Sequence, residues 1–349
     1  MADKTILAYI EPCGLPPLSP TDDVKERNMN RRDMLVRSGA ALTLGLGDSL
    51  FPRGWTTAAD SPKRRLLMYT RSVGYEHDVV KRPNRLNEKL RNDFGLSKDD
   101  QLSLAESIVI DLGKKHGFEV TATKDGRVFA GGDLDKYDAF VFETQGDLSK
   151  EGGDKEPPMP PEGKQALLKA IENGKGFVGF HCASDTFHSP GRSDQNQPPD
   201  KIDPYIAMVG GEFIVHGQQQ KAWMRVVDKS FPGAKNLNDF EVEEEWYALK
   251  NFAPDLHVIL VQDTRGMVSP QKGYQMYQRP NFPATWARMH HKGRVFYSSM
   301  GHRHDVWKNS IFQHLLLGAL SWATGNVDAD VTPNLEKTAP HADQLVNKK

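Results

Sequence analysis

From residue 63 onward, apolar and polar positions form a regular succession of strand-like and helix-like segments. Strands are predicted where short apolar runs or strict alternation occur, at residues 65–70, 118–123, 138–143 and 177–180. Helices are predicted where apolar residues recur at intervals of three and four, at residues 101–116 and 162–172. This alternation of strands with helices predicts an α/β fold built on a doubly wound, mostly parallel sheet.

The second half of the chain is richer in strand patterns and ends in a helix. Strands are predicted at residues 221–227, 256–262, 284–289 and 294–299, with a hairpin turn between the last two. Residues 309–324 have the spacing of a closing amphipathic helix, and the polar chain after Gly325 is expected to be disordered. We therefore predict a leader at residues 1–60, one domain at 61–326 and a polar tail at 327–349.

Composition and charge exclude several classes of protein. The chain is 38% hydrophobic and 26% charged with a formal net charge of −1, which gives no electrostatic case for binding nucleic acid or an anionic membrane surface. Its two cysteines, Cys13 and Cys182, rule out a disulfide framework and a thiolate zinc site. Any metal would be held by histidines and carboxylates.

The leader has the pattern of a twin-arginine export signal. Arg31 and Arg32 precede a mildly apolar run at residues 38–46, which is too short and too polar to span a bilayer. We predict export to the periplasm or another extracytoplasmic compartment, a route that carries folded proteins and fits a metal loaded beforehand. A disordered basic tail with a chance arginine pair is the alternative. Met29 is a second candidate start, and in that case Cys13 is not part of the protein.

Histidines follow several of the predicted strands. His181 ends the strand at 177–180, and His77 and His302 follow the first and last predicted strands. The carboxyl ends of parallel strands meet at one edge of a sheet, where ligands bind in open α/β folds. We therefore expect His77, His181 and His302 to converge, with His216 as a fourth member.

A carboxylate beside two aromatic residues forms another candidate site. Glu245 precedes Trp246 and Tyr247, and strand alternation places Glu245 on one face with Glu241 and Glu243. Carboxylates at this density usually form a solvated edge. An aromatic ring next to a carboxylate is also typical of sugar pockets, where the ring stacks on the sugar and the carboxylate binds its hydroxyl groups.

These motifs together resemble the ThuA-like (trehalose utilisation) family. The resemblance covers residues 64 to about 325 and rests on residues 74–78, 176–185, 210–213, 216, 240–247, 283–286 and 293–302. It implies a flavodoxin-like fold shared with class I glutamine amidotransferases, and a role in carbohydrate catabolism on a keto-glycoside or related sugar.

The resemblance also implies a change at the amidotransferase nucleophile. Gly179-Phe180-His181 matches the elbow at which amidotransferases present a cysteine, so His181 takes the nucleophile position and Cys182 falls one residue later. The chain lacks the later His-x-Glu pair, so glutamine hydrolysis is not expected. A free cysteine is most often a small buried hydrophobe, although a Cys182-dependent hydrolase is a third hypothesis.

Two principal hypotheses follow for function. The first is an exported enzyme in which His181 and Glu245 form an acid–base pair, with Asp185 either orienting His181 or capping the next turn. Its predicted substrate-binding residues are His77, His216, Trp246, Tyr247 and His302. In a metal-assisted version, ranked slightly behind the metal-free route, His77, His181, His216 or His302 would hold Zn²⁺ or a similar ion. The second hypothesis is a non-catalytic sugar-binding module.

Overall fold

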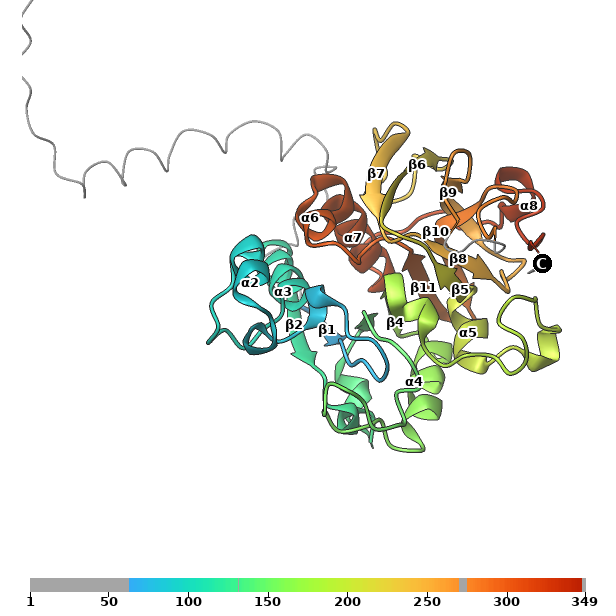
Figure 1. Ribbon diagram of the computed structural model, residues 1–349. Helices are drawn as coiled ribbons and strands as arrows, with labels where there is room; N and C mark the ends of the chain where they lie inside the picture. The colour runs from blue at the N-terminus through green and yellow to red at the C-terminus, as the bar shows by residue number, and fades with distance from the viewer. Residues whose placement is uncertain (1–62, 131, 270–274, 347–349) are drawn as a thin grey trace, which may run out of the picture. The chain divides into compact units, whose positions relative to one another are not determined.

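The computed structural model describes residues 63–130, 132–269 and 275–346 of the chain (Figure 1). The predicted export signal, Met29 and Cys13 lie outside these ranges. Within them no helix combines the length and the hydropathy needed to cross a membrane.

The described residues form a mixed α/β structure around a large sheet. The sheet strands are β1 (Arg64–Tyr69), β2 (Phe118–Thr123), β3 (Ala139–Phe142), β4 (Gly176–Phe180), β6 (Gln220–Val226), β7 (Phe240–Glu244), β9 (His257–Asp263), β10 (Phe282–His290) and β11 (Gly293–Ser298). A separate two-stranded sheet pairs β5 (Glu212–His216) with β8 (Tyr247–Lys250). The helices are α2 (Glu88–Phe94), α3 (Leu104–His116), α4 (Gly163–Glu172), α5 (Pro204–Val209), α6 (His304–Lys308), α7 (Ser310–Ala323) and α8 (Leu335–Thr338).

The strand order of the large sheet is β2-β1-β3-β4-β11-β10-β9-β6-β7. The pairings from β2 to β11 are parallel, and those from β11 to β7 are antiparallel. The sheet is therefore divided between the two directions, whereas the sequence pattern predicted mostly parallel strands. The difference arises in the second half, where hairpins join strands without intervening helices.

Apolar layers cover both faces of the parallel part of the sheet. Leu66 and Met68 of β1 belong to one buried cluster with residues of α3 and α7, whereas Leu67 and Tyr69 belong to another with residues of α4 and α5. Successive side chains of a strand face opposite sides, so a strand buried throughout needs cover on both. Each such side chain stabilises the fold by about 1.5–3 kcal/mol.

The helix boundaries follow local capping chemistry. Ser103 and Glu106 form a capping box at the start of α3, so that helix begins three residues later than the periodicity alone predicted. It ends at Gly117, which adopts the left-handed conformation typical of a helix C-cap.

The described part of the tail is ordered, so the prediction of disorder after Gly325 was wrong there. Leu335, Ala339 and Ala342 are buried against the domain. The Asn334 side chain accepts from the Val258 backbone N–H and donates to its carbonyl. These contacts hold the polar tail against the domain beside β9. The polar composition of the tail gave no indication of this packing.

Candidate functional site

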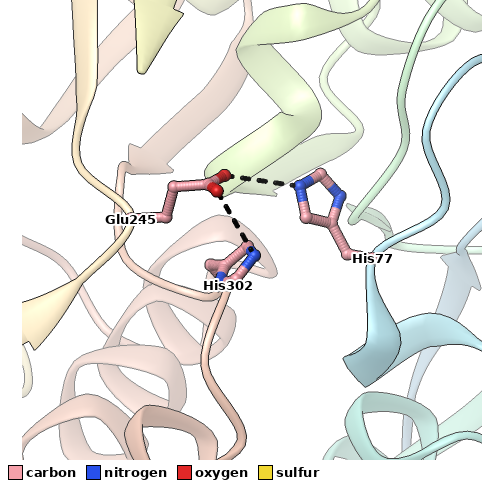
Figure 2. A group of neighbouring side chains, drawn as sticks. All are labelled: His77, Glu245 and His302. Carbon is pink, nitrogen blue, oxygen red and sulfur yellow. Dashed lines mark ion pairs between the residues drawn. The ribbon is translucent and has the colours of Figure 1, made fainter. Parts of the chain in front are cut away.

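Four histidines and one glutamate meet at the carboxyl ends of the parallel strands. His181 follows β4, His302 follows β11, and His77 lies in the loop after β1. His216 ends β5, and Glu245 lies between β7 and β8. Figure 2 shows Glu245 between the rings of His77 and His302, which come from opposite ends of the sequence.

Glu245 lies at the centre of this group, which we call the histidine–glutamate cluster. Its Oε2 atom is 3.4 Å from Nε2 of His181 and 3.8 Å from Nε2 of His77. Its Oε1 atom is 3.2 Å from Nδ1 of His216 and 3.6 Å from Nε2 of His302. The convergence that the strand order predicted is therefore present, including the fourth histidine.

Glu245 is held as a carboxylate by these neighbours. Burial by itself would raise its pKa, but the facing rings of His181, His77 and His302 together hold the pKa well below its ordinary value. The cluster thus places one negatively charged carboxylate among four imidazole rings.

His181 is fixed in one orientation and one tautomer. Its Nδ1 atom is 3.1 Å from the carbonyl oxygen of Ser299, which can only accept, so Nδ1 carries the proton. Its ring lies against Tyr247 with centroids 4.0 Å apart. Complete burial lowers the pKa of His181 to about 4, so the ring is neutral at neutral pH and Nε2 presents a lone pair to the cluster.

The backbone at His181 is strained. Its φ of +38° lies in the left-handed region, which costs a residue with a side chain roughly 1–3 kcal/mol. Such strain persists where the surrounding structure imposes it, and it often accompanies a functional position. Here it turns the chain sharply out of β4, so that the imidazole lies at the edge of the sheet.

His77 and His302 complete the inner part of the cluster. Their rings are nearly perpendicular with centroids 5.1 Å apart. Burial, together with the neighbouring ring of His181, lowers the pKa of His302 to about 3. Nδ1 of His77 is buried without a hydrogen-bond partner in the described part of the chain. Ligand atoms of His77, Glu245 and His302 lie within 4.8 Å of one another, which is close enough for a single ion.

Glu244 belongs to the site although sequence reasoning missed it. The alternation of β7 predicted that Glu244 and Glu245 would face opposite ways, but the strand ends at Glu244 and both side chains turn inward. The buried Glu244 carboxyl accepts from the backbone N–H groups of Gly301 at 3.0 Å and Glu245 at 2.9 Å. Burial nevertheless raises its pKa to about 7. Gly301 has a φ of +133°, so the turn that delivers His302 favours glycine.

Trp246 and Tyr247 do not offer the sugar platform that the sequence predicted. Trp246 is fully buried, and its Nε1 atom donates to the carbonyl of Gln220 at 3.0 Å. Tyr247 is 1% exposed and supports the ring of His181. The chain turns after Glu245, so the carboxylate faces the cluster while both aromatic rings pack into the protein.

Asp185 does not contact His181, so the prediction that it orients this ring was wrong. Its Oδ1 atom is 2.6 Å from Nε2 of His188, and its Oδ2 atom accepts from Gln145 at 2.9 Å. Asp185 and then Glu212 raise the pKa of His188 to about 9. The carbonyl of Ser299 orients His181 instead, and no side-chain motif could have indicated a backbone acceptor.

Cys182 has none of the properties of a nucleophile. It is fully buried, and its Sγ atom lies 3.6 Å from Oε1 of Glu143. Burial and the neighbouring Glu143 raise the pKa of the thiol well above its ordinary value. A nucleophilic cysteine needs the opposite shift, which disfavours the third hypothesis.

Hollows lie at both edges of the sheet. One of about 190 Å³ adjoins the cluster and is lined by Asp78, Val79, Leu90, Phe94, Gln219, His302, Arg303 and His304. One of about 340 Å³ lies at the opposite edge, where Arg64 and Arg294 pair with Asp138 and Asp328. We place the candidate site at the first hollow, because His302 of the cluster lines it.

Fold and site together define a mixed α/β protein with a candidate ligand site at the carboxyl edge of its parallel strands. The chain belongs to the trehalose utilisation (ThuA) family, whose profile matches residues 65–323. Membership suggests a carbohydrate-related function. A comparison with proteins of curated function gave no significant match.

Two of the solved structures that are similar to this chain are ThuA-like proteins. A ThuA-like protein from Bacteroides uniformis has 19% identity and a TM-score of 0.51, over 77% of this chain and 94% of that one. Another from Parabacteroides merdae has 18% identity and a TM-score of 0.45, over 82% of this chain and 100% of that one. At this identity the first likeness supports the fold alone.

Proposed function

We propose that this protein is an exported enzyme of carbohydrate catabolism that acts on a keto-glycoside or a related sugar. Family membership supports the substrate class. The observation that carries the enzymatic part is the pairing of a neutral His181, fixed by Ser299, with an ionised Glu245 at 3.4 Å.

This pairing favours a bound cation. The lone pair of His181 Nε2 and the Glu245 carboxylate both act as acceptors, so they repel each other unless a proton or a metal ion lies nearby. Histidines and a carboxylate without thiolate suit Zn²⁺ or a neighbouring transition metal, and three protein ligands leave room for a substrate oxygen. We assign His77, Glu245 and His302 as the ligands. The geometry thus favours the metal-assisted route over the metal-free one.

The chemistry we propose is proton abstraction next to a carbonyl. His181 Nε2 takes the proton from the carbon beside the keto group, and the electron pair of that C–H bond forms an enolate. A bound metal would stabilise the enolate oxygen. In a 3-keto-glycoside the enolate formed by loss of the C2 proton then expels the aglycone oxygen from C1, so the C1–O bond breaks, a C1=C2 bond forms and the C3 carbonyl is restored. The departing alkoxide takes a proton from water. Nδ1 of the half-exposed His216 lies 3.2 Å from Oε1 of Glu245 and connects the cluster to solvent.

The alternative, a non-catalytic sugar-binding module, predicts aromatic platforms without a paired acid and base. Trp246 and Tyr247, the residues proposed as platforms, are buried, whereas His181 and Glu245 lie 3.4 Å apart as a candidate pair. The convergence of four imidazoles on one carboxylate is also more than sugar binding requires.

Turnover of a panel of 3-keto-glycosides by the purified full chain tests the proposal. We expect the wild type to release the aglycone, His181→Ala to lose at least about 100-fold in kcat, and the exposed control His341→Gln to remain unchanged. Sugar binding by the wild type without turnover would favour the module.

A further inference from the structure

Tyr75 is the most exposed of the large apolar side chains in the described residues, at 62%. It lies beside the histidine–glutamate cluster, because its ring makes an edge-type contact with His77 at a centroid distance of 5.1 Å. Leaving an aromatic ring in water forgoes the free energy of burying it, and a ring this exposed contributes little to the core. Single exposed apolar side chains are normal on a protein surface, so the contact with the cluster is what distinguishes Tyr75.

The backbone that carries Tyr75 is held firmly. The Val73 N–H donates to the Gln145 carbonyl at 2.8 Å, and the Gly74 N–H donates to Oε1 of Gln145, also at 2.8 Å. A Cβ atom on Gly74 would lie only 2.6 Å from that Oε1 atom, so a residue without a side chain allows the Gln145 side chain to come this close to the backbone. Gln145 in turn donates to Asp185 at 2.9 Å. A ring presented on such a loop loses little conformational freedom when a ligand binds.

One face of the Tyr75 ring remains available. The Lys81 ammonium lies over the ring, 5.8 Å from its centroid, and it is itself paired with Asp78 at 2.6 Å. The large exposed fraction shows that the rest of the ring is open to solvent. An open aromatic face next to a polar cluster is the arrangement that binds a pyranose, whose C–H face is apolar and whose edge carries hydroxyl groups.

We propose that Tyr75 is the stacking platform for a sugar ring bound at the mouth of the histidine–glutamate cluster. This inference rests on the proposed function and names the residue that replaces Trp246 and Tyr247 in that role. A pyranose on Tyr75 lies next to His77, which places its polar edge toward Glu245. Tyr75 contributes to sugar binding and leaves the proton transfer to His181.

Isothermal titration of the full chain with trehalose and with methyl 3-keto-glucoside tests the platform. We expect Tyr75→Ala to weaken binding of the sugar by about 10-fold, whereas Tyr75→Phe and Tyr75→Trp retain it because they keep the ring. With a substrate that turns over, Tyr75→Ala should raise KM and leave kcat unchanged. Unfolding midpoints should stay at the wild-type value, because the side chain is exposed.

Trp223→Ala is the matched control. Trp223 is 44% exposed and also carries a cation over its ring, Arg225 at 5.3 Å, but it lies on β6. Its loss should leave sugar affinity unchanged. Equal binding by wild type and Tyr75→Ala overturns the platform and leaves the proposed function standing. Equal loss in Tyr75→Phe and Tyr75→Ala overturns stacking in favour of the hydroxyl. A wild type that binds neither sugar overturns the proposed function together with the platform.

Discussion

Nε2 of His181 lies 3.4 Å from Oε2 of Glu245, while Nδ1 of the same ring donates to the carbonyl of Ser299. This donation to a backbone carbonyl fixes the tautomer of His181 and leaves the lone pair of Nε2 facing the cluster. The sequence shows both side chains, but the orientation of the ring depends on a carbonyl that follows β11.

Removing the charge of Glu245 should abolish tight metal binding. Glu245→Gln keeps the shape of the side chain but removes the anionic ligand, so zinc affinity should fall by more than the roughly 10–100-fold that loss of an outer partner costs. Titration calorimetry with Zn²⁺ and metal analysis after dialysis measure this change. Glu172, His290 and His291 form a second group whose ligand atoms lie within 4.8 Å, so the double variant His290→Ala/His291→Ala is the control. Zinc retained by Glu245→Gln but lost by the control would assign the metal to the second group.

The ion pairs of His188 should make the free energy of unfolding decrease as the pH becomes alkaline. Its pKa is raised to about 9 from an ordinary value of 6.5, so the folded state binds the proton more tightly than the unfolded state. The stabilisation is complete below pH 6.5 and disappears as the pH rises through about 9. Because the side chain is 44% exposed, we expect about 1 kcal/mol after solvent screening. Urea unfolding of wild type and His188→Gln at pH 6 and pH 10 gives the difference, and a difference that does not change with pH would contradict the assignment.

Cys182 should be unreactive in the folded protein. Its burial and raised pKa leave it as an inaccessible thiol, so iodoacetamide at neutral pH should modify it only after unfolding. Peptide mapping distinguishes it from Cys13. Cys182→Ala should keep sugar turnover within about threefold of wild type, because the thiol has no part in proton transfer. Rapid alkylation of Cys182 with parallel loss of activity would restore the hydrolase hypothesis.

Gly318→Ala should destabilise the domain through a backbone clash. A Cβ atom at this position of α7 would come within 2 Å of the carbonyl oxygen of Pro232, so the helix or the loop must move. We expect a loss of about 1–3 kcal/mol in the free energy of unfolding. At Gly153 the nearest atom to an added Cβ lies 3.8 Å away, so Gly153→Ala should have almost no effect. Denaturant unfolding of both variants measures the contrast.

Export should depend on the arginine pair. Replacing Arg31 and Arg32 by lysines keeps the charge but changes the pattern that the twin-arginine route reads. We expect the variant to remain in the cytoplasmic fraction while the wild type reaches the periplasm. Equal delivery of both would instead favour the interpretation of residues 1–60 as a basic tail.

The sequence by itself determined most of the elements and the meeting of the histidines. Apolar periodicity located β1 to β4 and α7 to within a few residues, because buried side chains recur with the period of the strand or helix that carries them. The rule that parallel strands end at one edge then brought His77, His181 and His302 together.

Tertiary structure decided which side chains face the site. Because β7 ends at Glu244, the side chains of Glu244 and Glu245 both turn inward and Trp246 is buried. The alternation of apolar and polar residues does not predict the residue at which a strand ends. Asp185 paired with His188, because His188 lies within reach and the carbonyl of Ser299 already orients His181. Local sequence patterns identify the residues of the site. The direction in which each side chain points depends on contacts between segments more than a hundred residues apart, such as the one between His181 and Ser299.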